Sequence, residues 1–600
     1  MKKRSLTVLL AALLIVSLLL QGCTATVMKT VDDAPSATVL PAERSTAPTE
    51  PATAEPATLP EHVDYHDFDR PRDEDALAEI PFSEIVYERS DTEAICAEFA
   101  ALQKLVEDNA EFDEVLAANR AVCLKYAMFN TMSTYAYIRY SIDLNDTYFE
   151  SENDWSDRNS PLVEQAKEKC FTAMANSPLR AQLEAEYFDE GFFDFYDRFQ
   201  VYSNDRVVEL MQQEAELEAD YMSLQSDQTI AWNGEEVLFS EMIETLPYTE
   251  MLAAYRLYFD KYGAESASIL AQLIRLRREM AAELGYDSYA DFAYAYYYQR
   301  DYTPAQTKQY VTDIAEELTP YFYAAMNASY KEPMDTDTTM AMLKAVAYAF
   351  GGEFCAAYDY MIDYNLYDIS ESSSKMPGSF MTYLSAYEMP YLYVSPEKDI
   401  GDLMTAAHEF GHFVDGYVNC NGTSSIDCAE IFSQGLEFLT LNRADLTAQE
   451  REALTVSQLG GSVTVFLSQA CYAEFERRIY ELSDEELTQE NFDRIFNDCN
   501  EEFGMGMPGL EDIIGPGWIG INHFFVAPYY VISYCVSADV ALQIFEREQE
   551  HGDGLVLYRE LMGLSSDNTI LNLLSQTDMR SPFDEGRIAE IADLFDDYLD

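Results

Sequence analysis

Two histidines one helical turn apart, with a glutamate beside the first, occur in the segment His408-Glu409-Phe410-Gly411-His412. Residues i and i+4 share one face of an α-helix, so His408 and His412 can both reach a single metal ion. Glu409 projects next to that ion, where its carboxylate can accept a proton from an activated water molecule. Because the whole chain holds 6 histidines, a metal site explains this pattern better than a buried helix with two incidental histidines.

A catalytic metal site needs a third protein ligand, since such sites usually combine three side chains with a water molecule. The segment that follows supplies two carboxylates, Glu430 and Glu437, which lie about two helical turns apart on one face. Either can reach the metal, while the other holds a ligand histidine in place. The spacing alone leaves both assignments open.

These two segments together resemble the zinc signature of the thimet oligopeptidase and oligoendopeptidase F family. In that signature the first glutamate of an E-x-x-S-x-x-x-E element is the third zinc ligand, which the resemblance assigns to Glu430. Glu437 then corresponds to the family's supporting acidic position. The stretch between His412 and Glu430 is shorter here than in the mammalian thimet members.

A second block, from Gly515 to Tyr534, resembles the family's Gly-rich loop followed by a histidine and clustered tyrosines. The matching residues are His523, Tyr530 and Tyr534, and the two tyrosines are four apart, so both can face one cleft. Peptide hydrolysis passes through an oxyanion that needs hydrogen-bond donors, a role that the resemblance gives to this block. Because Tyr529 directly precedes Tyr530, which tyrosine donates stays open.

The resemblance implies a mostly α-helical, large metallopeptidase fold with a deep central channel that admits short, unfolded peptides. It implies one Zn²⁺ ion bound by His408, His412 and Glu430, with Glu409 as the catalytic base. The expected function is zinc-dependent hydrolysis of internal peptide bonds by an oligoendopeptidase. Two alternatives remain: a carboxypeptidase or dipeptidase-like exopeptidase using the same site, and a non-catalytic surface lipoprotein that binds peptides.

The first residues predict a targeting signal, because a basic start at Lys2-Lys3-Arg4 precedes an apolar run that is short for a membrane span. The sequence Leu20-Gln21-Gly22-Cys23 resembles the lipobox of bacterial lipoproteins, which would leave Cys23 as a lipid-bearing N-terminus. The Ala-, Thr- and Pro-rich stretch that follows cannot bury enough apolar surface to fold and predicts a flexible tether. We therefore expect a lipid-anchored protein outside the cytoplasm, with no other membrane contact.

The expected organisation is a signal peptide at 1–22, a tether at 23–70, an N-terminal helical domain at 71–300 and a catalytic domain at 301–600. A net charge of -69 argues against nucleic acid as a partner, because phosphates need a basic surface. The 10 cysteines are scattered and form no CxxC pair, so neither a disulfide framework nor a thiolate metal site is expected. Cys420 and Cys428 flank a short loop and could form a bridge.

Apolar residues at helical spacing dominate the chain from about Phe82 to Asp301. Clear examples are 92–108, 111–132, 162–173 and 253–284, and a Thr-Pro-x-Gln start at Thr303 predicts a helix reaching about Ser329. The exception lies before the histidine helix, where Met381–Leu384 and Tyr391–Val394 predict short strands. A small sheet beside the metal helix could offer its edge to an extended peptide, or be an ordinary structural hairpin.

Overall fold

The computed structural model describes residues 78–599, apart from 189–190, 200, 202–203, 226–227, 244, 373, 420–424 and 566–567. The predicted signal peptide, the tether and Cys23 lie outside the described residues, as does Cys420, so the suggested bridge to Cys428 stays a prediction. The described part is mostly helical with two small sheets, which confirms the predicted fold class. None of its helices is both long and apolar enough to cross a membrane.

The helices and strands that precede residue 300 are given first. They are η2 (Phe82–Glu84), α2 (Thr92–Glu107), α3 (Phe112–Ile142), α4 (Thr147–Ala175), α5 (Arg180–Glu186), α6 (Asp194–Arg198), α7 (Asp205–Gln225), β1 (Thr229–Trp232), β2 (Glu235–Leu238), α8 (Phe239–Ile243), α9 (Tyr248–Glu283) and α10 (Tyr289–Ala295).

The second group holds the strands beside the histidine helix and the long helices around it. It comprises α11 (Pro304–Leu318), η4 (Thr319–Tyr321), α12 (Phe322–Asn327), α13 (Thr336–Phe350), α14 (Glu353–Asp363), β3 (Tyr367–Asp368), β4 (Ser379–Leu384), η5 (Ser385–Tyr387), β5 (Met389–Val394), α15 (Gly401–Val418), α16 (Ile426–Arg443), α17 (Ala448–Ile479), α18 (Gln489–Glu502), α19 (Glu511–Ile514), η6 (Gly515–Gly520), α20 (His523–Val526), α21 (Ile532–His551), α22 (Gly554–Leu564), α23 (Ile570–Ser575) and α24 (Arg587–Leu599).

Local signals explain where α2 and α11 begin. Asp91 accepts a hydrogen bond from the Ala94 amide and starts α2, and Thr303 and Gln306 form the predicted capping box of α11. The helix predicted to reach Ser329 ends at Leu318 instead, because Pro320 follows and the chain continues as η4 and α12. Helices α3 and α4 are much longer than expected, since tertiary packing supports their polar turns.

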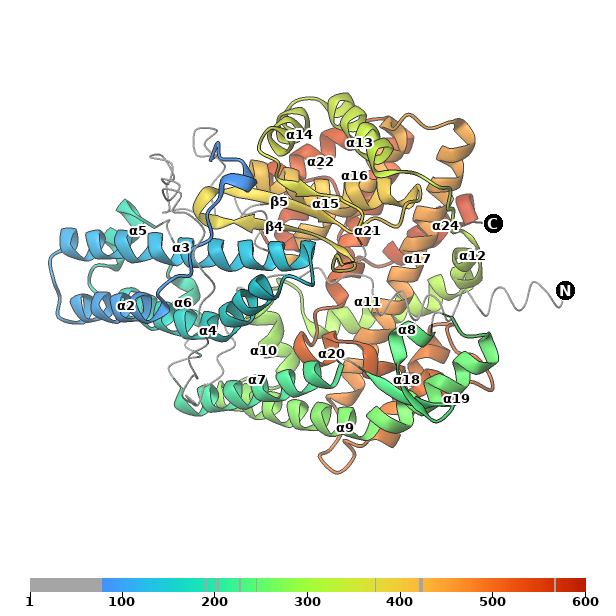
Figure 1. Cartoon of the computed structure of the whole chain (residues 1–600), viewed down its shortest axis with the longest axis horizontal. Coiled ribbons are helices and arrows are strands. Elements are labelled where there is room, and N and C mark those ends of the chain that lie inside the picture. The colour runs from blue at the N-terminus through green and yellow to red at the C-terminus, as the bar shows by residue number, and fades with distance from the viewer. Residues whose placement is uncertain are drawn as a thin grey trace.

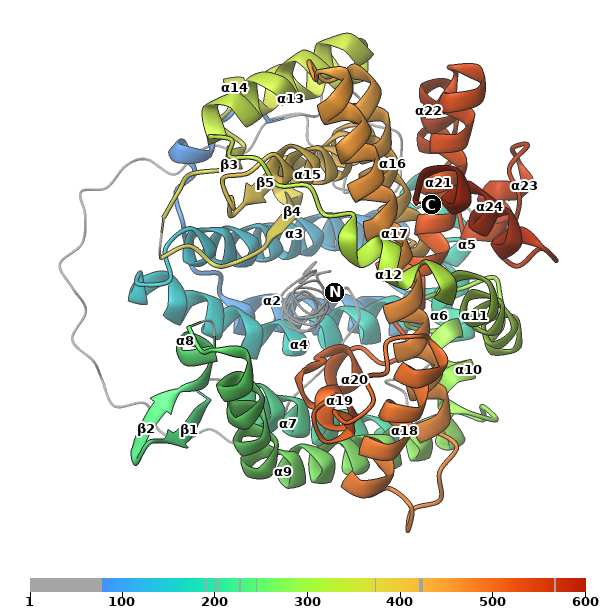
Figure 2. The same ribbon diagram turned by 90° about the vertical axis from the view of Figure 1, so that its right-hand side faces the viewer.

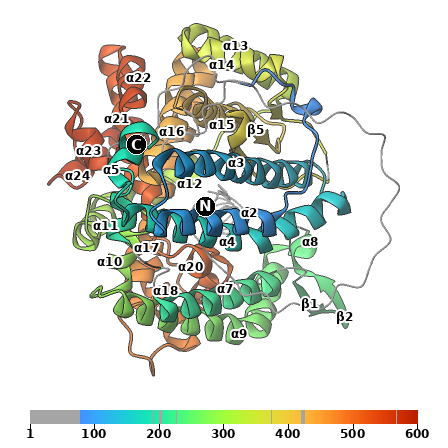
Figure 3. The same cartoon turned by 90° about the vertical axis from the view of Figure 1, so that its left-hand side faces the viewer.

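The helices form two halves, and the histidine helix α15 belongs to one of them. Figure 2 shows α13 to α16 and the three-stranded sheet above, and α7, α9 and α18 to α20 below, with α17 running between them. Helices α2, α3 and α4 pack together and extend to one side in Figure 1. The long α3 lies along the small sheet in Figures 1 and 3, where the Tyr393 hydroxyl donates to the Ser141 carbonyl over 2.8 Å.

The three-stranded sheet lies against α15, as the sequence predicted. Its order is β3-β5-β4, with β5 parallel to β3 and antiparallel to β4 in the register Ser379↔Val394 to Leu384↔Met389. The β1–β2 hairpin was not predicted, although its Asn233-Gly234 turn is a strong hairpin signal and both residues have positive φ, 53° and 89°.

Most buried apolar residues belong to one continuous core. It joins residues on both sides of position 300, such as Leu270 in α9 and Leu436 in α16, and a smaller core lies within α2 to α6. The proposed division into two folded domains at residue 300 stays a prediction. What the core provides is a rigid support for α15 and α16, whose inward faces are fully covered.

Candidate metal centre and active site

Helix α15 places the two histidines on one partly open face. Its other faces are buried against the sheet and α16, with Leu403, Ala407 and Phe410 each 0% exposed. The His408 and His412 side chains keep 22% and 16% of their surface exposed, so one side of each ring remains accessible. The spacing of four residues therefore has the predicted effect of presenting two imidazoles together.

A close approach of two helix backbones brings Glu430 to these rings. Gly411 faces α16, and a Cβ atom there would lie 2.8 Å from the Cα atom of Ser433, closer than real Cβ atoms come. Only glycine permits this approach, which sets the depth at which α16 packs on α15. Ser433 also donates from Oγ to Glu430 Oε2 over 2.8 Å and orients that carboxylate.

The ligand atoms of His408, His412 and Glu430 all lie within 4.8 Å of one another. Oε2 of Glu430 is 3.4 Å from Nε2 of His408 and 3.6 Å from Nε2 of His412. Two imidazole nitrogens and one carboxylate oxygen are a donor set that zinc favours, with room for a fourth ligand on the open side. The donor set and its convergence therefore fit a zinc ion.

Glu437 contacts His408 but is not part of the convergent His-His-Glu group. Its Oε1 atom lies 2.6 Å from Nδ1 of His408, on the opposite edge of the ring from Glu430. The amide of Gln458 in α17 donates to the other carboxylate oxygen of Glu437. The structure thus places the two carboxylates, which spacing alone left equivalent, at opposite edges of the His408 ring. Sequence reasoning did not find Gln458, because nothing near it in the chain marks its role.

The carboxylates and imidazoles of this centre shift each other's proton affinities. Burial opposes charge on His408, but the hydrogen bonds that its ring donates to Glu430 and Glu437 outweigh burial and hold the pKa of His408 well above its ordinary value. Burial also acts against the charge of Glu430, yet the two imidazoles hold the pKa of Glu430 well below its ordinary value. The carboxylates therefore stabilise positive charge at this centre.

Glu409 lies beside this cluster and is as buried as Glu430. The residue is 5% exposed, and burial raises the pKa of its carboxyl to about 7, against the opposing effect of His408 and His412. A carboxyl whose pKa lies near neutrality can take up and release a proton under working conditions. This is the property expected of a general base.

His523, Tyr530 and Tyr534 form a second cluster. The His523 ring centroid is 5.2 Å from that of Tyr530 and 6.1 Å from that of Tyr534, and the two tyrosine rings are 5.3 Å apart. Burial lowers the pKa of His523 to about 4, so its imidazole is neutral near pH 7. Tyr534 belongs to α21, which packs along α16, the helix that carries Glu430.

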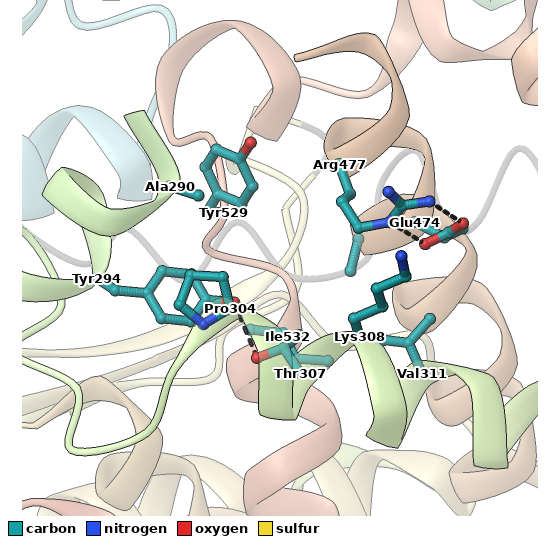
Figure 4. Close-up of a pocket in the computed structure, with 11 residues that line it drawn as sticks. Ala290, Tyr294, Pro304, Thr307, Lys308, Val311, Glu474, Arg477, Tyr529 and Ile532 are labelled. Carbon is teal, nitrogen blue, oxygen red and sulfur yellow. Dashed lines mark hydrogen bonds and ion pairs between the residues drawn. The ribbon is translucent and has the colours of Figure 1, made fainter. Parts of the chain in front are cut away.

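Tyr529 is directed away from this cluster, which separates the two adjacent tyrosines. Its ring lies 5.1 Å from Tyr480 and 6.2 Å from Tyr294, and it lines a small pocket with Tyr294, Lys308 and Arg477. Figure 4 shows Tyr529 and Tyr294 near one end of this pocket and the ion-paired Arg477 and Glu474 at the other. Tyr530, and not Tyr529, is the member of the pair that lies beside His523.

Helix α15, the sheet beside it and the convergent His-His-Glu group define the class of this protein: it is a metallopeptidase of mainly helical fold. Residues 355–591 match the profile of Peptidase family M3, and residues 82–196 match that of the Peptidase M3 N-terminal domain. The chain belongs to peptidase family M3, whose members are zinc metallopeptidases. The N-terminal match covers a region in which the sequence analysis recognised only generic helices.

Two curated relatives align over part of their length. Oligopeptidase PepF of Bacillus subtilis (strain 168) is 29% identical over 276 residues, which is 43% of this chain and 40% of the relative. The oligoendopeptidase F homolog of Borreliella burgdorferi is 26% identical over 202 residues, covering 31% of this chain and 33% of the relative. The aligned part of the chain thus spans about two fifths or less of these relatives.

Solved structures share the fold over nearly their whole length. PZ peptidase A with an inhibitor superposes with a TM-score of 0.72 at 22% identity, covering 86% of this chain and 99% of that chain. Oligoendopeptidase-F from Enterococcus faecium gives 0.55 at 15% identity, covering 84% and 97%. At these identities the likeness concerns the fold.

Proposed function

We propose that this protein is a zinc-dependent oligoendopeptidase that hydrolyses internal bonds of short, unfolded peptides. One observation carries the proposal: Glu430 Oε2 lies 3.4 Å from Nε2 of His408 and 3.6 Å from Nε2 of His412, with the buried carboxyl of Glu409 beside them. The names of the relatives, an oligopeptidase and an oligoendopeptidase homolog, support the substrate class.

Zinc held by His408, His412 and Glu430 would polarise a peptide carbonyl and make a water molecule more acidic. Glu409 removes a proton from the attacking water and delivers it to the leaving amine, for which its pKa of about 7 is suited. Neutral His523 and the Tyr530 hydroxyl donate hydrogen bonds to the carbonyl oxygen as it becomes negative. Tyr534 lies within the same cluster and supports both rings.

Metal analysis combined with activity assays tests zinc dependence. We expect about one zinc per chain, loss of peptide cleavage after chelation, and recovery when zinc is restored. A ladder of peptides of increasing length, together with a compact folded protein, tests the substrate class. Cleavage of the folded protein, or failure to cleave any short peptide with zinc bound, would contradict the proposal.

The mode of cleavage is tested with peptides blocked at both ends. An endopeptidase cleaves such peptides internally, whereas a carboxypeptidase or dipeptidase-like enzyme needs a free terminus. Products that appear only from unblocked peptides, one or two residues at a time, would favour the exopeptidase alternative.

The location proposed for the enzyme is the outer side of a bacterial cell membrane, with Cys23 as the lipid-bearing residue. The support is the basic start, the apolar run and the Leu20-Gln21-Gly22-Cys23 sequence. Membrane fractionation of cells that express the full chain or its Cys23→Ala variant tests this proposal. We expect the full chain in the membrane fraction and accessible to external protease, and the variant without lipid labelling.

A further inference from the structure

We propose that Arg300 is a positioning residue, which couples the turn that carries Tyr530 to the helix that carries Glu430. The inference rests on the proposed peptidase function. Arg300 lies between α10 and α11, far in sequence from both elements that it joins. Its side chain is 0% exposed, so its contacts are made entirely inside the protein.

On one side Arg300 holds the backbone of the tyrosine turn. Its Nη1 donates to the Tyr529 carbonyl over 2.9 Å, and its Nη2 donates to the Tyr530 carbonyl over 3.4 Å. The same Nη2 donates to the Ser533 hydroxyl over 2.7 Å, at the start of α21. Three acceptors within five residues are therefore tied to one planar guanidinium group.

On its other side Arg300 meets the first turn of α16. Its Nε atom lies 3.4 Å from Oδ2 of Asp427, whose side chain is 1% exposed. Asp427 stands three residues before Glu430, so the two carboxylates are about one helical turn apart on the same helix. A displacement of this ion pair would move the metal-binding helix and the tyrosine turn relative to each other.

The turn needs such support because its backbone is strained. Tyr529 has φ of 67°, in the left-handed region that non-glycine residues rarely occupy. Two further contacts restrain it: the Tyr298 hydroxyl donates to the Pro528 carbonyl over 2.8 Å, and the Tyr529 amide donates to Glu476 over 2.9 Å. With Arg300 these contacts fix the direction in which Tyr530 projects toward His523.

The surroundings of Arg300 favour arginine over lysine. The guanidinium carbon lies 4.4 Å from the ring centroids of both Tyr294 and Tyr298, which enclose the planar group. A lysine at this position keeps the charge beside Asp427 but has a single nitrogen, which cannot serve the turn and the aspartate together. Arg300→Lys thus removes the coupling while leaving a cation at the same buried position.

The test compares Arg300→Lys with a matched control, Arg587→Lys, in the zinc-loaded full chain. Arg587 is 3% exposed and forms a buried pair at 2.8 Å with Asp539, which lies on the same helix α21 as Ser533. Its other ion pairs are with Glu546 and Glu590 and lie away from the tyrosine turn. The measurements are kcat, KM, zinc content, the thermal midpoint, and the affinity of a phosphinic peptide that imitates the tetrahedral transition state.

For Arg300→Lys we expect kcat to fall about 100-fold, as for a donor moved by about 1 Å, with KM changed by no more than about threefold. The affinity for the phosphinic peptide should fall in parallel with kcat/KM, while zinc content matches that of Arg587→Lys. Unchanged kcat, or a fall in kcat/KM without a loss of phosphinic-peptide affinity, would overturn the inference.

Asp427→Asn and Ser533→Ala decide the matter if Arg300→Lys does not fold. Each removes one end of the coupling and should give a smaller loss of the same kind, in kcat and in phosphinic-peptide affinity together. Wild-type activity distinguishes a failure of the proposed peptidase function from a failure of the role proposed for Arg300. An inactive zinc-loaded wild type refutes the proposed function, whereas an active wild type with unaffected Asp427 and Ser533 variants refutes only the role of Arg300.

Discussion

Nδ1 of His408 lies 2.6 Å from Oε1 of Glu437, while Nε2 of the same ring lies 3.4 Å from Oε2 of Glu430. A carboxylate only accepts hydrogen bonds, so the contact with Glu437 places the His408 proton on Nδ1. When a metal ion binds, Nε2, which faces Glu430 and His412, would give up its own proton and supply the lone pair. One glutamate on α16 thus prepares the histidine for a metal, and the other completes the donor set.

Glu437→Gln should weaken zinc binding about 10- to 100-fold, because an amide orients the His408 ring less firmly and does not raise its basicity. Competition with a calibrated chelator measures this affinity. Glu317→Gln, at an exposed position of α11, is the matched control and should bind zinc as wild type does. Equal affinity for both variants would show that Glu437 does not support the ligand.

Glu409→Gln should retain zinc and lose turnover, because the amide keeps the shape of the side chain but cannot carry the transferred proton. General acid-base catalysis contributes about 10²- to 10⁴-fold, so kcat should fall by at least that range. Zinc stoichiometry and kcat, determined on the same preparation, distinguish this result from the Glu437 variant. Activity close to wild type would remove Glu409 from the proposed mechanism.

Gly411→Ala should force α15 and α16 apart. The added Cβ atom would lie 2.8 Å from Cα of Ser433, a backbone atom that cannot move alone. Overpacking of this kind costs about 1–3 kcal/mol, and the displaced Glu430 should also bind zinc more weakly. Urea unfolding and zinc affinity measure the two effects.

Gly461→Ala is the control for this substitution, since it lies within α17 and a Cβ atom there meets nothing within 4 Å. It should stabilise the protein by about 0.8 kcal/mol, the ordinary gain of alanine over glycine in a helix. If both alanine variants are equally stable, the close approach at Gly411 does not limit the packing of α15 on α16.

The metal-binding motif was predictable because its geometry is local. His408, Glu409 and His412 belong to one helix, and the helical repeat alone decides which of them share a face. The choice between Glu430 and Glu437 depends on how α16 is rotated against α15, which the close contact at Gly411 determines. That contact is long-range, so only the family resemblance could indicate the choice beforehand.

The second cluster was predictable in its members but not in its support. Tyr529 adopts a left-handed conformation, although glycine and asparagine are the residues that usually indicate one in a sequence. This conformation directs the Tyr529 and Tyr530 side chains to different sides. Arg300 and Asp427 are distant in sequence and meet only in the folded core. By contrast, the β1–β2 hairpin was predictable from its Asn233-Gly234 turn, but it was not predicted.

Glu476→Gln should change how stability depends on pH. Burial raises the pKa of Glu476 to about 8 from an ordinary 4.5, despite the opposing Tyr529 amide and the charges of Arg277 and Arg300. In the folded protein this carboxyl therefore keeps its proton over a range in which the unfolded chain has lost it. Its contribution to the unfolding free energy is complete below about pH 4.5 and is lost as the pH rises through about 8.

Glutamine keeps an oxygen that can accept from the Tyr529 amide but does not titrate, so the decline in stability between about pH 5 and 8 should be shallower in Glu476→Gln than in wild type. Urea unfolding at several pH values measures the two slopes, and Glu317→Gln should keep the wild-type slope, because its carboxyl is exposed. Identical slopes in all three proteins would mean that Glu476 ionises as readily in the folded state as in the unfolded chain. The turn that carries Tyr530 would then be held by a charged carboxylate throughout the range, because the Tyr529 amide is its hydrogen-bond donor at 2.9 Å.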